Sequence, residues 1–406
     1  MSLKDNASLL RSSRRLKRQG GSLKPTRESE YEEDTKHFPT VLAKCYEEFS
    51  VAEFPIIKEY VIHAYDQIAL LDFQENLIEY IDIRTFCEVY YEPDRCSVRK
   101  LACRLPKITS NALLALNKAI SSCLSLSSLD LNYCNLTSKH LLILKNGIKD
   151  LKTITDLSLK GNPNEEQNFE LFVNMGLKSL SLKFCEINKN GLRRLSNEFL
   201  NVSPGVSLIH LDLSSNMVFN EGCEYIADIL RCDRCLLSLN LSDCKISDEG
   251  IEEILNCFHP FQLKEKEILQ RRRIRFEYYK KIQNYGSCHK DIEEQIEKHP
   301  FVCDVTVENG ELLCKGNNVL KNLNLAYNHI SKDGLQSILK VLMAQMSVDI
   351  SLKRIGTEGN NQKDHQHINK AIEEVLGGKL LGKSEESVRS SRRRKSSSRN
   401  SQINNI

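Results

Sequence analysis

The middle of the chain repeats one pattern of apolar positions, in which leucine or isoleucine stands first, fourth and sixth and asparagine or cysteine stands ninth. Full copies begin at Leu126, Ile154, Leu177, Leu208, Leu236 and Leu320, and weaker edge copies carry Val98-Leu101-Cys103-Ile108 and Val348-Ile350-Ile355. Alternating apolar residues predict a short buried strand. We expect the asparagine or cysteine to hold backbone groups where the chain leaves that strand. The pattern therefore predicts a stack of strands, one from each copy.

Each strand is followed by a segment that predicts a helix. A capping residue and a glycine open this segment, as in Asn220-Glu221-Gly222, Ser247-Asp248-Glu249-Gly250 and Ser331-Lys332-Asp333-Gly334. Apolar residues at helical spacing follow, such as Ile251, Ile254 and Leu255. The copies are mostly 28 residues apart, with 23 and 31 as variants. One copy cannot bury its apolar face alone, so the copies must stack to form a core.

These repeats resemble the ribonuclease-inhibitor type of leucine-rich repeat over about residues 98–355. The resemblance implies an α/β solenoid shaped like a horseshoe, with strands inside and helices outside. It also implies an intracellular interaction protein, and related repeat proteins occur in cilia and flagella. We therefore expect a cytoplasmic protein, with a cilium or flagellum as its more specific location.

The regular spacing breaks between Leu239 and Leu323, which lie 84 positions apart where one repeat would take about 28. The extra residues predict an insertion of two parts. The segment 262–283 is basic and aromatic and predicts a helix, whereas 302–314 alternates around Asn309-Gly310, a strong hairpin signal. An insertion of this size in a regular repeat array is usually functional.

The remaining segments predict a cap and two tails. Helical spacing of Val41, Leu42, Cys45, Tyr46 and Phe49, and then of Ile56, Ile57, Tyr60, Val61 and Ala64, predicts a small helical cap. The predicted parts are a disordered basic arm (1–36), the helical cap (37–92), leucine-rich repeats (93–258), an inserted helix and hairpin (259–318), terminal leucine-rich repeats (319–356), and a short helix around 368–376 followed by a disordered basic, serine-rich tail (357–406).

Charge is strongly segregated along the chain. Residues 1–27 hold eight lysines or arginines against Asp5, and 383–399 hold seven against two glutamates. The two ends together therefore carry about +12. Since the net charge of the whole chain is only +3, the body between them carries about −9. The basic tails are candidate binders of a polyanion such as the microtubule surface, and Ser396 after Arg393-Arg394-Lys395 is a candidate phosphosite.

Several kinds of chemistry find little support in the sequence. The chain has 15 cysteines but no secretory signal, so we interpret them as reduced, buried thiols. Cys232 and Cys235 have zinc-ligand spacing with Cys257 and His259 nearby, but they straddle a predicted helix-to-strand junction, so no metal is expected. No catalytic constellation, phosphate-binding glycine loop or cofactor motif is found, and no stretch is long and apolar enough to span a membrane. We predict a protein without enzymatic activity.

The candidate binding positions lie on the inner strand face and the turn that follows it, where the repeat pattern leaves side chains pointing away from the core. They are Asp130, Tyr133, Asp156, Phe184, His210, Asp212, Asn240, Asp243 and Tyr327. Small and acidic side chains dominate this set, which suits a polar partner. The simpler interpretation is a solvated strand face.

A second candidate surface is the basic insertion, comprising Arg271, Arg272, Arg273, Arg275, Lys280 and Lys281 with interleaved aromatic residues. It would suit an anionic surface, such as an acidic protein tail, a phospholipid or RNA, although we do not expect nucleic acid as the main partner. The alternative is a solvent-exposed helix whose Ile268, Ile274 and Ile282 pack on the repeats.

The function that the sequence favours is a scaffold that binds a protein partner, with microtubule or axonemal proteins as candidates. Two alternatives stay open. Phe38-Pro39 followed by apolar residues weakly resembles an F-box, which would make the protein a ubiquitin-ligase substrate receptor. Similar repeat arrays also regulate GTPases, which would require an available arginine or asparagine at the turn edge, whereas Asn216 and Asn328 have predicted structural roles.

Overall fold

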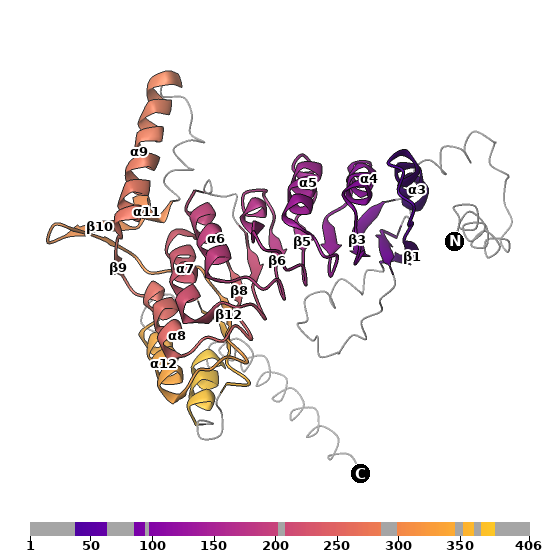
Figure 1. Ribbon diagram of the computed structural model, residues 1–406. Coiled ribbons are helices and arrows are strands. Elements are labelled where there is room, and N and C mark those ends of the chain that lie inside the picture. Colours follow the sequence, from indigo (N-terminus) through magenta and orange to yellow (C-terminus); the bar gives the residue numbers. More distant parts are fainter. Residues whose placement is uncertain are drawn as a thin grey trace, which may run out of the picture. The chain divides into compact units, whose positions relative to one another are not determined.

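The computed structural model describes residues 37–62, 85–93, 97–201, 208–285, 299–345, 352–360 and 367–377. The chain forms two compact units, Met1–Ile187 and Asn188–Ile406. The predicted basic arm, the far basic tail and Ser396 lie outside the described residues. Both units are built from strands that carry a layer of helices on one face (Figure 1).

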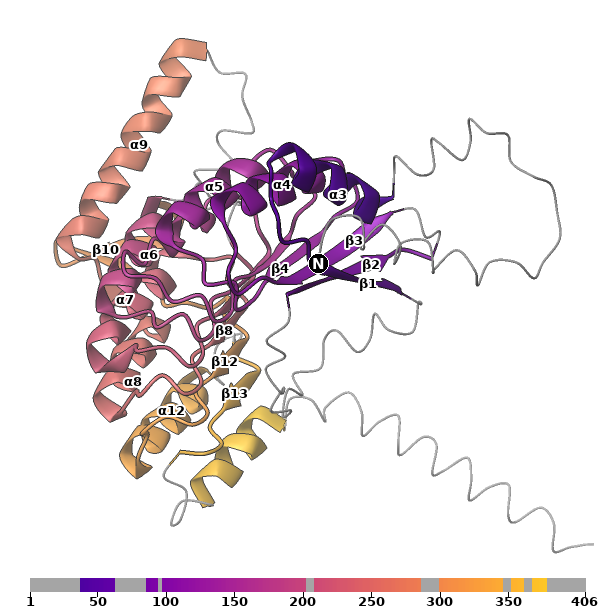
Figure 2. The ribbon, with the colours of Figure 1, turned by 45° about the vertical axis from the view of Figure 1, so that its right-hand side comes forward.

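The N-terminal unit has strands in chain order from β1 to β6. Its elements are α3 (Phe38–Glu48), β1 (Ile56–Val61), β2 (Phe86–Tyr91), β3 (Val98–Arg104), α4 (Ser110–Ser121), β4 (Ser128–Leu131), α5 (Ser138–Ile148), β5 (Asp156–Ser158), η3 (Phe169–Phe172) and β6 (Ser179–Ser181). Pairing is antiparallel only between β2 and β3 and parallel elsewhere. Helices α3, α4 and α5 lie on the same side of these strands (Figures 1 and 2).

The predicted helical cap is only partly helical. Helix α3 forms where the apolar spacing predicted a helix, and its buried residues include Phe38, Leu42, Cys45 and Tyr46. The second run, from Ile56, is instead the strand β1, which pairs in parallel with β2. Its β-branched and aromatic residues favour a strand, and its apolar spacing was compatible with either structure. Ala64 lies outside the described residues.

The C-terminal unit contains β7 (His210–Asp212), β8 (Ser238–Asn240), β12 (Asn322–Asn324) and β13 (Arg354–Gly356) as parallel strands. Their helices are α6 (Lys189–Asn201), α7 (Phe219–Cys232), α8 (Asp248–Leu255) and α12 (Lys332–Gln345), followed by a helix over residues 367–377. Strand β8 pairs directly with β12 although 84 positions separate Leu239 from Leu323. The inserted residues therefore leave the parallel sheet uninterrupted.

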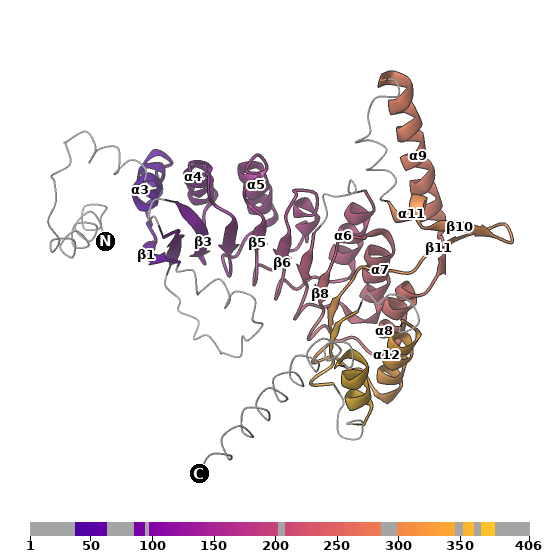
Figure 3. The ribbon, with the colours of Figure 1, turned by 180° about the vertical axis from the view of Figure 1, so that it is seen from behind.

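The insertion forms η4 (Asn256–Phe258), β9 (Phe261–Gln262), α9 (Glu265–Tyr285), α11 (Pro300–Cys303) and the hairpin of β10 (Val305–Glu308) and β11 (Glu311–Cys314). Asn309 and Gly310 connect the two hairpin strands, both with positive φ. Strand β9 joins β11 to give a small three-stranded sheet. Helix α9 extends away from the layer formed by α6, α7 and α8 (Figures 1 and 3).

Leucines at the fourth and sixth positions of each copy form the core of both units. Those at the fourth position are at most 2% exposed: Leu101, Leu129, Leu157, Leu180, Leu211, Leu239 and Leu323. The 23-residue copy, from Leu157 to Leu180, has the short helix η3 where the other copies have a full helix. A shorter copy has too few residues for a longer helix.

The turn asparagine connects its repeat to the previous one by hydrogen bonds. The Nδ2 of Asn328 donates to the carbonyls of Leu241 and Leu325, while its Oδ1 accepts from the amides of Cys244 and Ile246. Asn162 makes the equivalent four bonds in the N-terminal unit. Cysteine at this position instead donates its thiol to a carbonyl of the preceding repeat, as Cys134 and Cys244 do. These side chains replace the backbone partners that a strand lacks where it ends.

The last repeat begins later than the sequence pattern indicated. Val348 and Ile350 lie outside the described residues, and the final strand instead has Ile355 opposite Leu323. Asn360 then occupies the turn position and donates to the carbonyls of Leu325 and Thr357. The sequence pattern placed this copy in a different register because Thr357 stands where the pattern expects an apolar residue.

Candidate protein-binding surface

The two predicted acidic residues on the open face of the N-terminal sheet both have side-chain partners. Lys100 of β3 lies 2.7 Å from the carboxylate of Asp130 on β4, and both side chains are partly buried. The carboxylate of Asp156 accepts a hydrogen bond from the hydroxyl of the adjacent Thr155 at 2.7 Å. Although the structure places both predicted residues on the open face, it does not make this face a free acidic surface.

On the C-terminal sheet the same row has a structural role. The Oδ1 atoms of Asp212, Asn240 and Asn324 accept from backbone amides two residues later, at 3.0, 3.1 and 3.0 Å. Such local bonds fix the turn that follows each strand. His210 is exposed beside this row. The short polar side chains that were predicted for a partner are therefore also required by the fold.

The turn after each strand has an unusual backbone conformation. We call the residue immediately before the turn asparagine or cysteine the rim position. It has positive φ in each described repeat from β4 onward: Tyr133 (53°), Gly161 (70°), Phe184 (56°), Ser215 (54°), Asp243 (53°), Tyr327 (57°) and Gly359 (71°). The amides of Tyr133 and Tyr327 donate to carbonyls of the following repeat, namely those of Lys160 and Glu358. The left-handed conformation is thus built into the repeat and is not confined to glycine.

Two rim tyrosines pack against glycines of the next repeat. A Cβ atom added to Gly161 would lie 2.2 Å from the ring of Tyr133, and one added to Gly359 would lie 2.3 Å from the ring of Tyr327. Each ring therefore covers a neighbouring glycine with one face. The side chain of Tyr327 is nevertheless 62% exposed and that of Phe184 is 43% exposed.

Cations lie over the rim aromatics of the N-terminal unit. Arg104 and Lys160 lie 4.8 and 5.7 Å from the centroid of the Tyr133 ring, and Lys183 lies 5.3 Å from that of Phe184. These distances are within the range of cation–π contacts. The sequence interpretation missed these three basic residues, although Lys160 and Lys183 directly precede rim positions. At the rim of the C-terminal unit, Asp243 is paired with Lys245 at 2.7 Å.

The base of α9 is held by buried charges. Arg231 of α7 donates to both carboxylate oxygens of Glu267, at 2.7 and 2.6 Å, and its guanidinium lies 3.8 Å from the centroid of Phe261. The Arg231 and Glu267 side chains are 10% and 2% exposed. Lys264 and Lys266 both pair with the buried Asp228. These contacts fix the direction in which α9 leaves the repeats.

Most of the predicted basic residues of α9 face solvent. Arg272, Arg273, Arg275 and Lys280 are exposed, and the structure describes nothing of the Lys281 side chain. Arg271 is partly buried, and burial lowers its pKa. Leu269, Phe276 and Tyr279 are 56, 65 and 53% exposed and lie on the same side of the helix, since they are seven and three residues apart. Ile268 and Ile274 are partly buried, and Ile274 lies on the side of the helix opposite Leu269 and Phe276.

The cysteines have structural environments in the part of the chain that the structure describes. Burial raises the pKa values of Cys134, Cys244 and Cys257 to about 12, which keeps these thiols protonated. Cys232 donates to the carbonyl of Ile229 and Cys257 to that of Ala227. Within the described ranges, no three histidine, cysteine or acidic side chains are grouped as a metal site.

None of the helices that the structure describes is both long and apolar enough to cross a bilayer. Helix α9 is the longest, at 21 residues, but it carries charged residues along its length.

Comparison with known proteins supports the repeat assignment. Residues 232–255 and 316–339 match a family model described as leucine-rich repeat. The human NACHT, LRR and PYD domains-containing protein 13 is 28% identical over 220 residues, which cover 46% of this chain and 21% of that protein. Protein 14 of the same series from Mus musculus is 28% identical over 137 residues, covering 32% and 14%. The chain contains leucine-rich repeats, and it spans only a small part of the length of these relatives.

Proposed function

We propose that this leucine-rich-repeat protein is a non-enzymatic scaffold that binds a protein partner through its rim residues, the adjoining open strand face and the inserted helix α9. The observation that carries the proposal is the placement of exposed aromatic side chains at left-handed rim positions. Leucine-rich-repeat proteins generally serve in protein interactions, which agrees with this proposal.

The rim aromatics stand where glycine would fit the backbone better. A non-glycine residue in the left-handed region costs about 1 kcal/mol. Gly161 and Gly359 occupy the same position in other repeats. Burial alone does not account for Phe184 and Tyr327, because both rings remain substantially exposed. Aromatic side chains are enriched among the residues that dominate binding energy at protein interfaces, so a partner contact would offset this backbone cost.

The chemistry of the rim favours a partner with acidic groups beside apolar ones. Arg104, Lys160 and Lys183 lie over aromatic rings in the N-terminal unit. Arginine and aromatic residues together also form the exposed side of α9. A protein surface with carboxylates around an apolar depression would satisfy either set of side chains.

Helix α9 would provide a second contact. Its exposed Leu269, Phe276 and Tyr279 have the spacing of a helix that inserts one side into a groove. Arg272, Arg275 and Lys280 flank these residues and would pair with acidic groups along such a groove. The buried Arg231–Glu267 pair keeps the helix in a fixed direction, which lowers the entropy cost of binding.

We further propose a ciliary or flagellar setting, with an axonemal protein as the partner. The support is a sequence resemblance to leucine-rich repeat-containing protein 71. It is carried by the repeat at Leu236–Leu241, the helix at 248–258, and Pro260-Phe261 leading into Arg271-Arg272-Arg273. The basic tails would then add attachment to a polyanion such as the microtubule surface.

The two alternative functions have less support. The F-box interpretation rested on a helical segment after residue 37, and β1 and β2 occupy much of that segment. The GTPase-regulator interpretation required an available arginine or asparagine at the turn edge. Asn216 and Asn328 are 3 and 4% exposed, and their side-chain amides donate to backbone carbonyls.

Proximity labelling in a ciliated cell type would test the proposal. The full chain would be compared with a rim variant, Phe184→Gly with Tyr327→Gly, and with an α9 variant, Arg272→Glu with Arg275→Glu. The exposed Lys340→Glu on α12 provides a matched control for surface charge. We expect axonemal neighbours that are lost in the rim and α9 variants and retained in the control. Unchanged neighbours in both variants would contradict the proposed surfaces, and ubiquitin-ligase or GTPase neighbours would favour an alternative function.

A further inference from the structure

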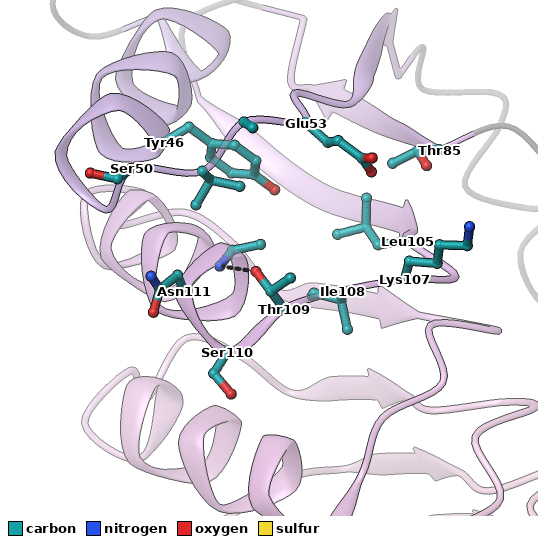
Figure 4. A pocket seen from close by; sticks show the side chains of 13 residues that line it. Tyr46, Ser50, Glu53, Thr85, Leu105, Lys107, Ile108, Thr109, Ser110 and Asn111 are labelled. Carbon is teal, nitrogen blue, oxygen red and sulfur yellow. Dashed lines mark hydrogen bonds between the residues drawn. The ribbon is translucent and has the colours of Figure 1, made fainter.

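A cavity of about 440 Å³ lies in the N-terminal unit. It is bounded by the loop between α3 and β1, by Thr85 before β2, and by the loop between β3 and α4 together with the first turn of α4 (Figure 4). Small-molecule sites in proteins typically range from about 300 to 1,000 Å³. The cavity is therefore large enough to hold one ring with a polar head group.

The inner end of the cavity presents a buried hydroxyl group. Tyr46 of α3 is only 1% exposed, and its ring meets that of Phe54 edge-on at 5.2 Å between centroids. Its hydroxyl points into the cavity (Figure 4). Within the described residues, no hydrogen bond to this hydroxyl is found, whereas the hydroxyls of Tyr90 and Tyr91 donate to glutamates. Because this hydroxyl faces the cavity, a ligand hydroxyl placed beside it would replace a water molecule as its hydrogen-bond partner.

The walls and mouth of the cavity differ in chemistry. Val51, Leu105 and Ile108 supply apolar walls, and the last two are at most 8% exposed. Glu53 and Lys107 supply one negative and one positive charge on the side away from Tyr46 (Figure 4). The first turn of α4, which begins after the capping residue Thr109, also lines the cavity. The first amides of a helix lack acceptors within the helix and favour an anionic group.

We propose that this cavity binds a free aromatic α-amino acid with a hydroxyl on its ring. The ring lies between the apolar walls, and its hydroxyl exchanges a hydrogen bond with that of Tyr46. The ammonium group faces Glu53, while the carboxylate faces Lys107 and the start of α4. This arrangement uses the two opposite charges at the mouth and the unpaired hydroxyl at the inner end.

The proposal can be tested with four related probes on the full chain, using calorimetry and thermal unfolding. L-tyrosine carries all three groups, L-phenylalanine lacks the hydroxyl, N-acetyltyrosine lacks the ammonium and tyrosinamide lacks the carboxylate. We expect tyrosine to bind in the millimolar range or tighter and phenylalanine about tenfold more weakly, since one hydrogen bond to a buried group is lost. Tyrosinamide that binds as well as tyrosine would contradict the contact proposed for the carboxylate, and N-acetyltyrosine that does so would contradict the contact proposed for the ammonium group.

Tyr46→Phe separates the role of the hydroxyl from that of the fold, because it keeps the ring against Phe54. We expect this variant to bind tyrosine and phenylalanine equally. Tyr90→Phe is the matched control, since it removes a hydroxyl that already bonds to Glu88 in the same unit. Ala112→Leu should fill the cavity and abolish binding. No binding of any probe to the wild-type chain would overturn the proposal, as would an unchanged preference for tyrosine in Tyr46→Phe.

Discussion

Buried polar groups are stabilised by different kinds of interaction in the repeats and in the insertion. The repeats use neutral side chains, as when Asn328 makes four hydrogen bonds to backbone groups of two neighbouring turns. The insertion uses charges, with Arg231 against Glu267 and two lysines against Asp228, and a buried histidine, His299, before α11. The neutral network should be insensitive to pH and salt, whereas the insertion should respond to changes in charge and protonation.

The largest effect is expected from Asn328→Ala in the repeats. The substitution leaves two amides and two carbonyls in a buried turn without their side-chain partner, and we expect it to lower the free energy of unfolding by about 4 kcal/mol. Denaturant titration at neutral pH measures this change. The control is Asn324→Ala on the same turn, which removes one accepted hydrogen bond and should cost about 1 kcal/mol. Equal effects would show that the buried asparagine is not a special anchor.

The second effect concerns the charged anchor of the insertion. Arg231→Met leaves the buried carboxylate of Glu267 without its partner, and we expect a loss of about 3 kcal/mol. The double variant Arg231→Met with Glu267→Met should recover much of this loss, because replacing a whole buried ion pair by apolar groups is often nearly neutral. Chemical denaturation of the two single variants and the double variant measures the coupling. Additive losses would argue against a direct ion pair.

A third effect is a pH dependence that belongs to the insertion. Burial, with the charge of Arg234, lowers the pKa of His299 from its ordinary 6.5 to about 4. The unfolded chain therefore binds a proton at a higher pH than the folded chain does. The contribution of neutral, buried His299 to the stability of the fold is therefore fully present above pH 6.5 and is lost as the pH falls toward 4.

The expected loss at pH 5 is about 2 kcal/mol relative to the stability at pH 7. In the folded protein, Nδ1 of His299 accepts a hydrogen bond from the amide of Phe301. The variant His299→Asn keeps a side chain that can cap this amide, but an asparagine side chain cannot titrate. The difference in the free energy of unfolding between wild type and variant should therefore become smaller as the pH is lowered. A constant difference from pH 7 to pH 5 would mean that His299 does not titrate in this way.

The same contrast explains what the sequence could predict. The turn positions Asn162, Asn216, Cys244 and Asn328 were found because a periodic pattern repeats each local environment. The pairing of Arg231 with Glu267 joins a repeat helix to the aperiodic insertion across 36 positions, so no spacing rule indicates it. Likewise, no spacing rule indicates that Lys100 pairs with Asp130, because these two residues meet only through strand pairing.

The rim positions were partly predictable. Their place in the repeat is periodic, but their backbone conformation was not evident from the sequence. Nothing in the spacing of Tyr133, Phe184 and Tyr327 indicates a positive φ. The glycines at 161 and 359 were the available signal, because glycine at an equivalent position of other repeats indicates a left-handed turn. The cavity beside Tyr46 had no such signal, since it depends on loops between non-repeating elements.

The smallest expected effect on stability, and the most informative for function, comes from Tyr327→Gly. Glycine adopts the left-handed backbone at position 327 without strain, so the variant should stay within about 1 kcal/mol of the wild type despite losing the ring over Gly359. Tyr327→Ala loses the same ring but keeps the unfavourable φ, and should be less stable than the glycine variant by about 1 kcal/mol. Thermal unfolding of both variants gives this order. If the glycine variant is stable yet loses its neighbours in proximity labelling, the tyrosine is held at the rim for binding; if both variants keep their neighbours, the ring serves only to pack against the next repeat.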